Sequence, residues 1–156
     1  MRSGNPRHVI VRTAWVLSPN GQNFLKTMLR LGAERPKLRV VDDQLGSPTH
    51  ARDLAEALAK ITLRQIADPH CATGTFHFTN AGSVTWHGLA VEIFRLVAAA
   101  GRLVPEVEAI ATSEYPLPAR RPANSRLALD KIRQDFGIEP RPWQNAIQDI
   151  VAELLA

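Results

Sequence analysis

The sequence predicts an α/β fold with at least one strand in a parallel sheet. Short apolar runs of strand length alternate along the chain with longer segments whose apolar residues recur at helical spacing. The run from Val9 to Leu17 is almost continuously apolar and β-branched, which is typical of a strand buried on both faces, and residues 19–21 (Pro-Asn-Gly) close it. Such a strand needs neighbouring strands, and this chain has only a few other short ones. We therefore expect a missing half of the protein or a second copy of the chain to pair with it.

The first half of the chain should continue with a helix, a strand, a loop and a second helix. Apolar spacing predicts a helix from Asn23 that ends before Pro36, followed by a short strand from Leu38 to Val41. Residues 42–49 are polar and predict a loop. The second helix should begin near Thr49 or His50, with its apolar face formed by Leu54, Ala55, Leu58 and Ile61.

The middle of the chain predicts a strand followed by a well-bounded helix. Alternation over Gly74–Asn80 indicates a strand with Phe76 and Phe78 on the same side. Thr85 is then expected to be the N-cap of a helix that ends before Gly101. The apolar face of that helix comprises Leu89, Ile93, Leu96 and Val97.

The last third predicts a short strand, an irregular loop and two helices. Val107–Ile110 has strand character, whereas the prolines of Tyr115–Pro122 exclude regular structure. A short helix should cover Leu129–Phe136 and stop at Gly137. Pro142 should begin the final helix, whose apolar face comprises Trp143, Ile147, Ile150, Val151 and Leu154. We expect residues 1–156 to form a single unit, because no repeat or linker divides the chain.

Composition argues for a soluble globular protein. The chain has 156 residues, of which 45% are hydrophobic and 22% charged, enough to bury a core. No apolar run approaches the roughly 20 residues needed to span a bilayer, and the N-terminus lacks the apolar core of a signal peptide, so we expect a cytoplasmic protein without a membrane partner. The single cysteine, Cys71, cannot form an internal disulfide and should be a buried or half-buried thiol.

The charge distribution argues against nucleic acid. The net charge is +4, with 11 Lys/Arg against 6 Asp/Glu up to Phe78 and 8 against 9 after it. The cations stand singly among apolar residues without an aromatic ladder, so we expect no nucleic-acid partner. A phosphorylated small molecule would account for a modest basic excess equally well. The five histidines lack the helical spacing of metal ligands, and we expect no metal site.

Four motifs occur in an order that points to one family. They are Arg12-Thr13-Ala14-Trp15-Val16, Asn23-Phe24, the segment 43–49 (DQLGSPT) with Asp53-Leu54-Ala55, and the segment 120–127 (RRPANSRL). From about Pro6 to the end, the chain resembles the C-terminal, substrate-binding part of dTDP-4-dehydrorhamnose reductases, which are extended short-chain dehydrogenases of the NAD-dependent epimerase/dehydratase superfamily. It departs from the family at Leu17, where relatives often carry an aromatic residue.

The resemblance implies an incomplete Rossmann-like sheet, represented by its C-terminal strand and helix, together with a small α/β substrate-binding domain. In the family, NADPH reduces a dTDP-linked 4-keto sugar while a tyrosine donates a proton and a lysine assists it. Here the only tyrosine, Tyr115, has Ala119 where a Tyr-x-x-x-Lys pair would have lysine, and no glycine-rich cofactor motif exists. We therefore expect no catalytic residues and no cofactor on this chain alone, and whether it is an enzyme stays open. Only 11 residues precede Arg12, so the NADPH-binding half is expected to be absent.

The resemblance implies a dTDP-sugar as the small-molecule partner and suggests nine contacts. These substrate-binding candidates are Trp15, Asn23, Gln44, Gly46, Thr49, Arg120, Arg121, Asn124 and Ser125. In the family the tryptophan faces the sugar, and paired arginines with neighbouring amide and hydroxyl groups suit diphosphate oxygens. The loops around Trp15, Gln44 and Arg121 are therefore expected to converge on one pocket.

Each candidate also has a structural interpretation that the residues alone leave open. Trp15 could fill core between strand and helix, and Asn23 could cap the helix that follows it. The segment 44–49 could be an ordinary strand-to-helix turn, and for Asp53 we favour a structural role at backbone amides of the first helical turn. The segment 120–125 could be a solvated basic turn in which Asn124 or Ser125 caps a helix.

Two hypotheses of different classes follow from these observations. The first is the substrate-binding portion of a dTDP-4-dehydrorhamnose reductase, inactive alone and associating with a separate N-terminal half. The second is a non-catalytic sugar-nucleotide-binding or dimerising module from a truncated gene, in which the exposed first strand forms a homodimer.

Overall fold

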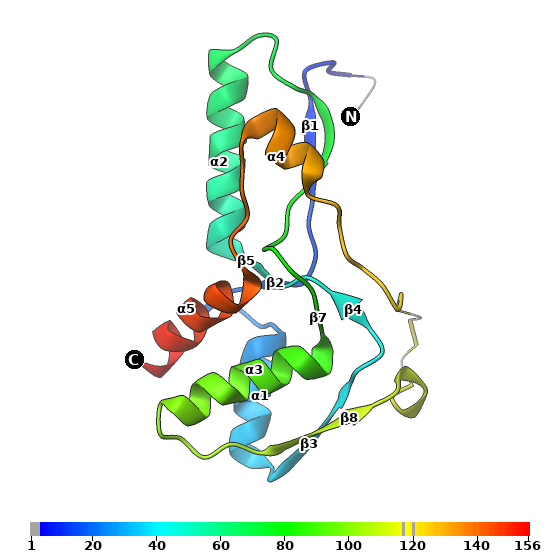
Figure 1. Ribbon diagram of the computed structural model, residues 1–156, viewed down its shortest axis with the longest axis vertical. Coiled ribbons are helices and arrows are strands. Elements are labelled where there is room, and N and C mark those ends of the chain that lie inside the picture. The colour runs from blue at the N-terminus through cyan, green and yellow to red at the C-terminus, as the bar shows by residue number, and fades with distance from the viewer. Residues whose placement is uncertain (1–3, 117, 120) are drawn as a thin grey trace.

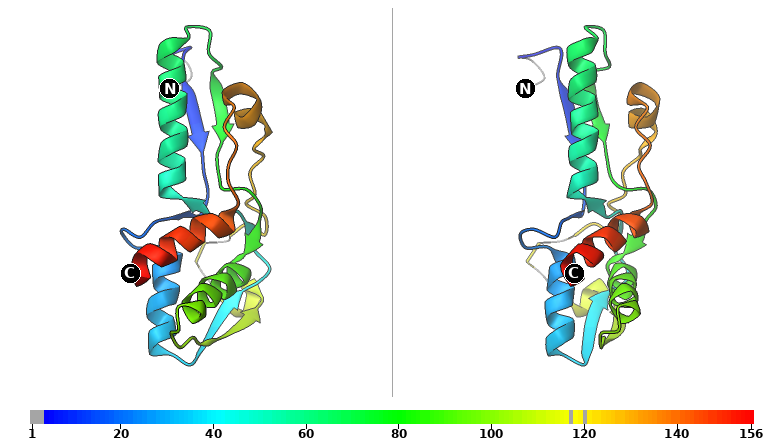
Figure 2. Two further views of the ribbon diagram at one scale, coloured as in Figure 1. Left: turned by 60° about the vertical axis from the view of Figure 1, so that its left-hand side comes forward. Right: turned by 90° about the vertical axis from the view of Figure 1, so that its left-hand side faces the viewer.

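The computed structural model describes residues 4–116, 118, 119 and 121–156. The chain is elongated, with secondary structure at both ends and helix α5 (Trp143–Leu155) between them (Figure 1, Figure 2). One end holds β1 (Val9–Arg12), α2 (Ala51–Ala67), β6 (Gly74–His77) and α4 (Asp130–Phe136). The other end holds α1 (Phe24–Glu34), β3 (Lys37–Val41), α3 (Trp86–Ala99) and β8 (Glu106–Ile110).

The strands pair two by two, and the longer pairs are parallel. β1 pairs with β6 from Val9↔Gly74 onward, and β3 pairs with β8 from Lys37↔Glu106 onward. Near the middle, β2 (Val16–Leu17) pairs in parallel with β5 (Thr49–His50), and β4 (Leu45–Gly46) pairs antiparallel with β7 (Val84–Thr85). The predicted α/β class with a parallel first strand is confirmed.

Local signals in the sequence place the helix ends. The Asn23 side chain caps α1 by accepting from Lys26 N at 3.1 Å, and the Thr85 hydroxyl caps α3 by accepting from Gly88 N at 3.0 Å. Gly137 ends α4 with a φ of 63°, and Pro142 directly precedes α5. None of the described helices is long and apolar enough to cross a membrane.

Two clusters of buried apolar side chains form the core. The larger joins α1, α3, α5 and β3, with Leu25, Ile93 and Ile147 fully buried. The smaller joins α2, β6 and α4, with Ile61, Phe76 and Ile132 buried. α1, α3 and α5 turn their apolar faces towards the larger cluster, which is the main source of helix stability in a folded protein. The apolar face predicted for α2 is only partly buried: Leu54 and Ile61 pack in the smaller cluster, whereas Ala55 and Leu58 are exposed.

The single strand predicted over Val9–Leu17 is wrong. The chain leaves β1 after Arg12, turns at Trp15, which has a φ of 47°, and only then enters β2. Two bonds from Thr49 hold the turn: its N–H donates to the Trp15 carbonyl at 3.0 Å, and its hydroxyl donates to the Ala14 carbonyl at 2.7 Å. The turn redirects the chain from the β1–β6 pair towards the other end of the molecule.

The loop predicted over residues 42–49 is also not fully irregular, because it contains β4 and the start of β5. Both pair with distant segments, so polarity within the loop could not reveal them. The strand predicted over Gly74–Asn80 ends earlier, at His77, although Phe78 N still donates to the Arg12 carbonyl at 2.9 Å. Cys71 is buried, as expected.

Candidate functional site

A cavity of about 980 Å³ lies between α1, β3 and the segment that follows β8. Apolar side chains of α1 form one wall, with Phe24, Met28 and Leu31. Gln44, Trp86 and Thr112 also line the cavity. The rest of the described lining comprises Thr27, Arg35, Lys37, Leu38, Arg39, Val40, Val41, Ile110, Tyr115, Pro116, Pro118, Ala119 and Arg121. We call this cavity the α1–β3 pocket.

Four cations line the α1–β3 pocket, and acidic side chains engage two of them. Lys37 Nζ lies 3.1 Å from Glu106 and 3.0 Å from Glu108, and Arg39 Nη2 lies 3.0 Å from Glu114. Within the described residues, neither Arg35 nor Arg121 forms an ion pair. Both side chains are exposed, so both are free to meet an anionic ligand.

Trp15 supports the wall of the pocket from behind. Its ring stacks on Trp86 with centroids 3.5 Å apart and planes 12° apart, and Trp86 in turn contacts Phe24 at 4.7 Å. Trp86 and Phe24 line the pocket. Trp15 is not among its lining residues and is connected to it only by the contact with Trp86. Direct contact between Trp15 and a sugar remains a prediction.

Gly46 is required by the position of the Trp15 ring. A Cβ atom at residue 46 would lie 2.4 Å from the indole and 2.8 Å from the Ser125 hydroxyl, so any side chain there would overlap with both. Ser125 N donates to the Leu45 carbonyl at 2.8 Å, and Leu45 N donates to the Ala123 carbonyl at 2.8 Å. These bonds bring the segment after residue 120 beside Gln44 and Gly46, as convergence of the two loops requires.

Four of the candidate residues are already engaged within the protein. Asn23 caps α1 and donates to the Ser18 carbonyl at 2.7 Å, and Thr49, which is fully buried, holds the turn at Trp15. Asn124 accepts from Arg126 N at 3.1 Å, and Ser125 is paired with Leu45, so neither side chain caps α4. Ligand contacts by these four residues stay predictions. Arg120 lies outside the described residues.

Three residues that were not among the candidate contacts take part in the geometry of the site: Trp86, Thr112, and Asp43, which the sequence offered only as part of the segment 43–49. Trp86 opens α3, and its spacing does not distinguish it from a core residue. Asp43 and Thr112 are 69 positions apart, yet the Asp43 carboxylate accepts from Thr112 N at 2.9 Å and also accepts from the Thr112 hydroxyl. A local pattern cannot reveal such a pair.

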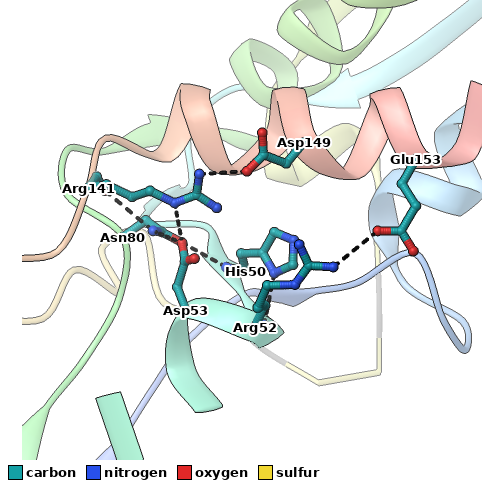
Figure 3. Close-up of polar contacts among 7 residues, drawn as sticks. All are labelled: His50, Arg52, Asp53, Asn80, Arg141, Asp149 and Glu153. Atoms are coloured by element: carbon teal, nitrogen blue, oxygen red, sulfur yellow. Dashed lines mark hydrogen bonds and ion pairs between the residues drawn. The ribbon is translucent and has the colours of Figure 1, made fainter. Parts of the chain in front are cut away.

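A buried polar network joins the two ends of the molecule. Asn80 is fully buried; its Oδ1 accepts from His50 N at 2.8 Å and its Nδ2 donates to Asp53 at 2.6 Å (Figure 3). Arg141 donates to Asp53 at 2.8 Å and to Asp149 of α5 at 2.6 Å. The network thereby connects α2, the segment after β6 and α5.

This network corrects the role expected for Asp53. Its carboxylate accepts from Asn80 and Arg141 instead of from backbone amides of the first turn of α2; the His50 side chain accepts from one of those amides, Arg52 N, at 2.9 Å. Burial alone would raise the pKa of Asp53, but the bonds from Arg141 and Asn80 outweigh it and the pKa is lowered. Asp53 therefore has a structural role, but through tertiary contacts with Asn80 and Arg141.

His50 should make the stability of the chain depend on pH. Burial lowers the pKa of its imidazole from the ordinary value of 6.5, with Asp53 opposing the change and Arg141 and Arg52 adding to it. The unfolded chain then binds a proton more readily than the folded one. Stability is therefore complete above about pH 6.5 and is lost as the pH falls from there to the folded-state pKa, at up to about 1.4 kcal/mol per pH unit.

The measurement is urea denaturation between pH 5 and pH 8. His50→Asn keeps a side-chain acceptor for the helix N-terminus but cannot titrate, so its unfolding free energy should vary less over this range than that of the wild type. His70→Asn, at an exposed position, is the matched control and should retain the wild-type dependence. Parallel pH profiles for the wild type and His50→Asn would contradict this assignment.

No group of three or more metal-binding side chains occurs among the described residues. Three of the described helices carry a side-chain cap at their N-terminus. α1, α2 and α3 are capped by their own Asn23, His50 and Thr85 side chains, and Asp53 adds negative charge to the first turn of α2.

The fold of short parallel strand pairs with covering helices is that of a part of an extended short-chain dehydrogenase. The fold is similar to that of a UDP-galactose 4-epimerase, with a TM-score of 0.68 at 19% identity over 96% of this chain and 45% of that one. The family model described as the RmlD substrate binding domain matches residues 1–156, and the chain belongs to that family. The resemblance inferred from the four motifs is thus confirmed.

Individual relatives agree with the family. A dTDP-4-dehydrorhamnose reductase of Aggregatibacter actinomycetemcomitans is 45% identical over 95% of this chain and 51% of its own length. The corresponding protein of Sinorhizobium fredii is 43% identical over 98% of this chain and 52% of its own length. A solved structure of a Clostridium acetobutylicum dTDP-4-dehydrorhamnose reductase gives a TM-score of 0.87 at 35% identity, over 99% of this chain and 51% of that one. The chain spans about half the length of these relatives.

Proposed function

We propose that this chain is the substrate-binding portion of a dTDP-4-dehydrorhamnose reductase and holds a dTDP-sugar in the α1–β3 pocket, which we call the nucleotide pocket from here on. The observation that carries the proposal is that Gln44 and Arg121, 77 positions apart, line one cavity whose wall Trp15 supports through Trp86. The cavity lies within the size range of small-molecule sites, roughly 300–1,000 Å³.

The pocket offers each part of such a ligand a suitable partner. The guanidinium groups of Arg35 and Arg121 suit the oxygens of a diphosphate, because both are donors without an acidic partner among the described residues. The apolar α1 wall suits the flat face of a base or the apolar face of a deoxy sugar. Lys37 and Arg39 would contribute less, since carboxylates already engage them.

The chemistry of reduction is assigned to protein outside this chain. A Bacillus anthracis dTDP-4-dehydrorhamnose reductase was solved in complex with NADP, and 34% of its aligned residues are identical to this chain. We expect no NADPH on this chain alone, because side chains of the chain itself cap the N-termini of α1, α2 and α3 and the sole tyrosine lacks a lysine four positions later. In the complete enzyme, NADPH would reduce dTDP-4-dehydro-L-rhamnose to dTDP-L-rhamnose; alone, this chain should be inactive.

We further propose that an NADPH-binding α/β half docks against β1. Within the described residues, β1 pairs only with β6, which leaves its other edge open. Beside it lies a groove of about 500 Å³ lined by Val9, Val11 and Ile61, with Leu58 42% and Ile66 75% exposed on α2. A parallel strand with a covering helix would close that edge and bury these side chains.

Isothermal titration with dTDP and gel filtration together test the proposal. Saturable 1:1 binding of dTDP, without NADPH oxidation by the isolated chain, is the expected result. Absence of dTDP binding in a stable dimer would instead favour the dimerising module. Adding the N-terminal half of a relative should restore turnover, and NADPH-dependent turnover by this chain alone would refute the division of labour.

A further inference from the structure

A chain of hydrogen bonds crosses from the loop after β3 to the loop after β8 at the edge of the nucleotide pocket. The Asp43 carboxylate accepts from Thr112 N at 2.9 Å and from the Thr112 hydroxyl. The Thr112 oxygen in turn accepts from Gln44 Nε2 at 2.9 Å. Gln44 and Thr112 both line the pocket, and the Gln44 side chain is otherwise buried.

The direction of these bonds fixes the orientation of the Gln44 amide. A threonine hydroxyl has one proton, and here that proton points to a carboxylate, which can only accept. Hydrogen bonds from the Thr112 hydroxyl and backbone N–H lower the pKa of Asp43, so the carboxylate keeps this role at neutral pH. The Thr112 oxygen must therefore accept from its other neighbour, and Gln44 must present Nε2 to it.

The opposite side of the amide then offers an acceptor to the pocket. Within the described residues no group donates to Gln44 Oε1. The fully buried side-chain atoms that lack a hydrogen-bond partner there are His50 Nε2 and Thr79 Oγ1, and Gln44 Oε1 is not one of them. Gln44 Oε1 is thus accessible on the pocket side. The cationic groups of Arg35, Lys37, Arg39 and Arg121 can only donate, so a fixed acceptor among them distinguishes a ligand that bears a donor.

We propose that Asp43 and Thr112 are positioning residues that hold Gln44 Oε1 as the hydrogen-bond acceptor for a donor on the bound nucleotide sugar. This inference rests on the proposed function of the nucleotide pocket. The shared chemistry is an N–H or O–H donor, which either the imide of a thymine-type base or a sugar hydroxyl supplies. A site built to accept such a bond rejects ligands that leave the acceptor unpaired.

Asp43→Asn should reverse the direction of the chain of bonds. The new amide can donate to the Thr112 oxygen, which then gives its own proton to Gln44, so Gln44 turns and presents Nε2 to the pocket. The affinity for the donor-bearing ligand should fall by about tenfold. Thr112→Val should cause a similar loss, whereas Thr112→Ser keeps the hydroxyl and should stay within about twofold of the wild type.

Isothermal titration with dTDP and with dTDP-L-rhamnose separates the two donors. A loss seen with dTDP itself assigns the base, and a loss confined to dTDP-L-rhamnose assigns the sugar. Asp42→Asn is the matched control, because Asp42 lies on the same loop as Asp43 but accepts from the Thr85 hydroxyl instead of from Thr112. This substitution should leave both affinities unchanged. Undiminished binding of both ligands by Thr112→Val would overturn the proposal even if Asp43→Asn failed to fold.

A second measurement does not depend on a ligand. In ¹⁵N NMR spectra of the free chain, the Gln44 side-chain NH₂ signals should shift and exchange faster in Thr112→Val but not in Thr112→Ser. Unchanged signals in Thr112→Val would overturn the positioning role. A wild-type chain with the expected signals but no dTDP binding would instead refute the proposed function and leave the orientation of Gln44 supported.

Discussion

Asn80→Ala is expected to lower the free energy of unfolding by about 2–4 kcal/mol. Asn80 is fully buried and makes two good bonds, accepting from His50 N and donating to Asp53. Alanine would leave a buried backbone N–H without a partner and would remove one of the two groups that hold the Asp53 carboxylate. Both losses fall on the connection between the two ends of the molecule.

Urea denaturation at pH 7 measures this effect. Asn145→Ala is the matched control, since Asn145 is an exposed amide on α5, and it should change stability by no more than about 0.5 kcal/mol. Asp53→Ala should add less in the Asn80→Ala background than in the wild type, because the two side chains share a bond. A loss below about 0.5 kcal/mol for Asn80→Ala would show that the network does not hold the ends together.

Arg121→Ala should weaken the binding of dTDP by about 10- to 100-fold while leaving the stability of the chain unchanged. The Arg121 side chain is exposed at the pocket and makes no ion pair within the described residues, so its removal costs the fold little. A charge-assisted bond from guanidinium to phosphate contributes about 1.5–3 kcal/mol, which sets the size of the expected loss. Arg121→Lys keeps the charge but not the two-pronged geometry and should fall between.

The readout is isothermal titration with dTDP at fixed ionic strength. Arg102→Ala provides the control, because Arg102 donates to the Leu155 carbonyl at 3.1 Å and does not line the pocket. Equal affinities of Arg121→Ala and the wild type would remove Arg121 from the site. Weakening by Arg102→Ala to the same degree would indicate a nonspecific effect of charge.

The sequence by itself determined the helices, because their signals are local. The cap residues Asn23 and Thr85, the left-handed stop at Gly137 and Pro142 before α5 act on neighbours within one turn, and the apolar spacing between them gives the buried faces. The order of the four motifs also identified the family, since motifs are read along the chain. Arg121 and Gln44 were selected in this way before their positions in space were known.

Only the tertiary structure decided how these segments meet. The break at Trp15, the pairing of β4 and β5, and the network around Asn80 depend on partners tens of residues away, and a local pattern carries no information about them. Trp86 and Thr112 joined the site for the same reason: each looks ordinary in its own segment and gains a role through a neighbour from another. Asp43 belongs to the 43–49 motif, but its role comes from its bonds with Thr112. Hydrophobic period fixes which face of an element is buried, whereas long-range hydrogen bonds and ring stacking fix what that element is buried against.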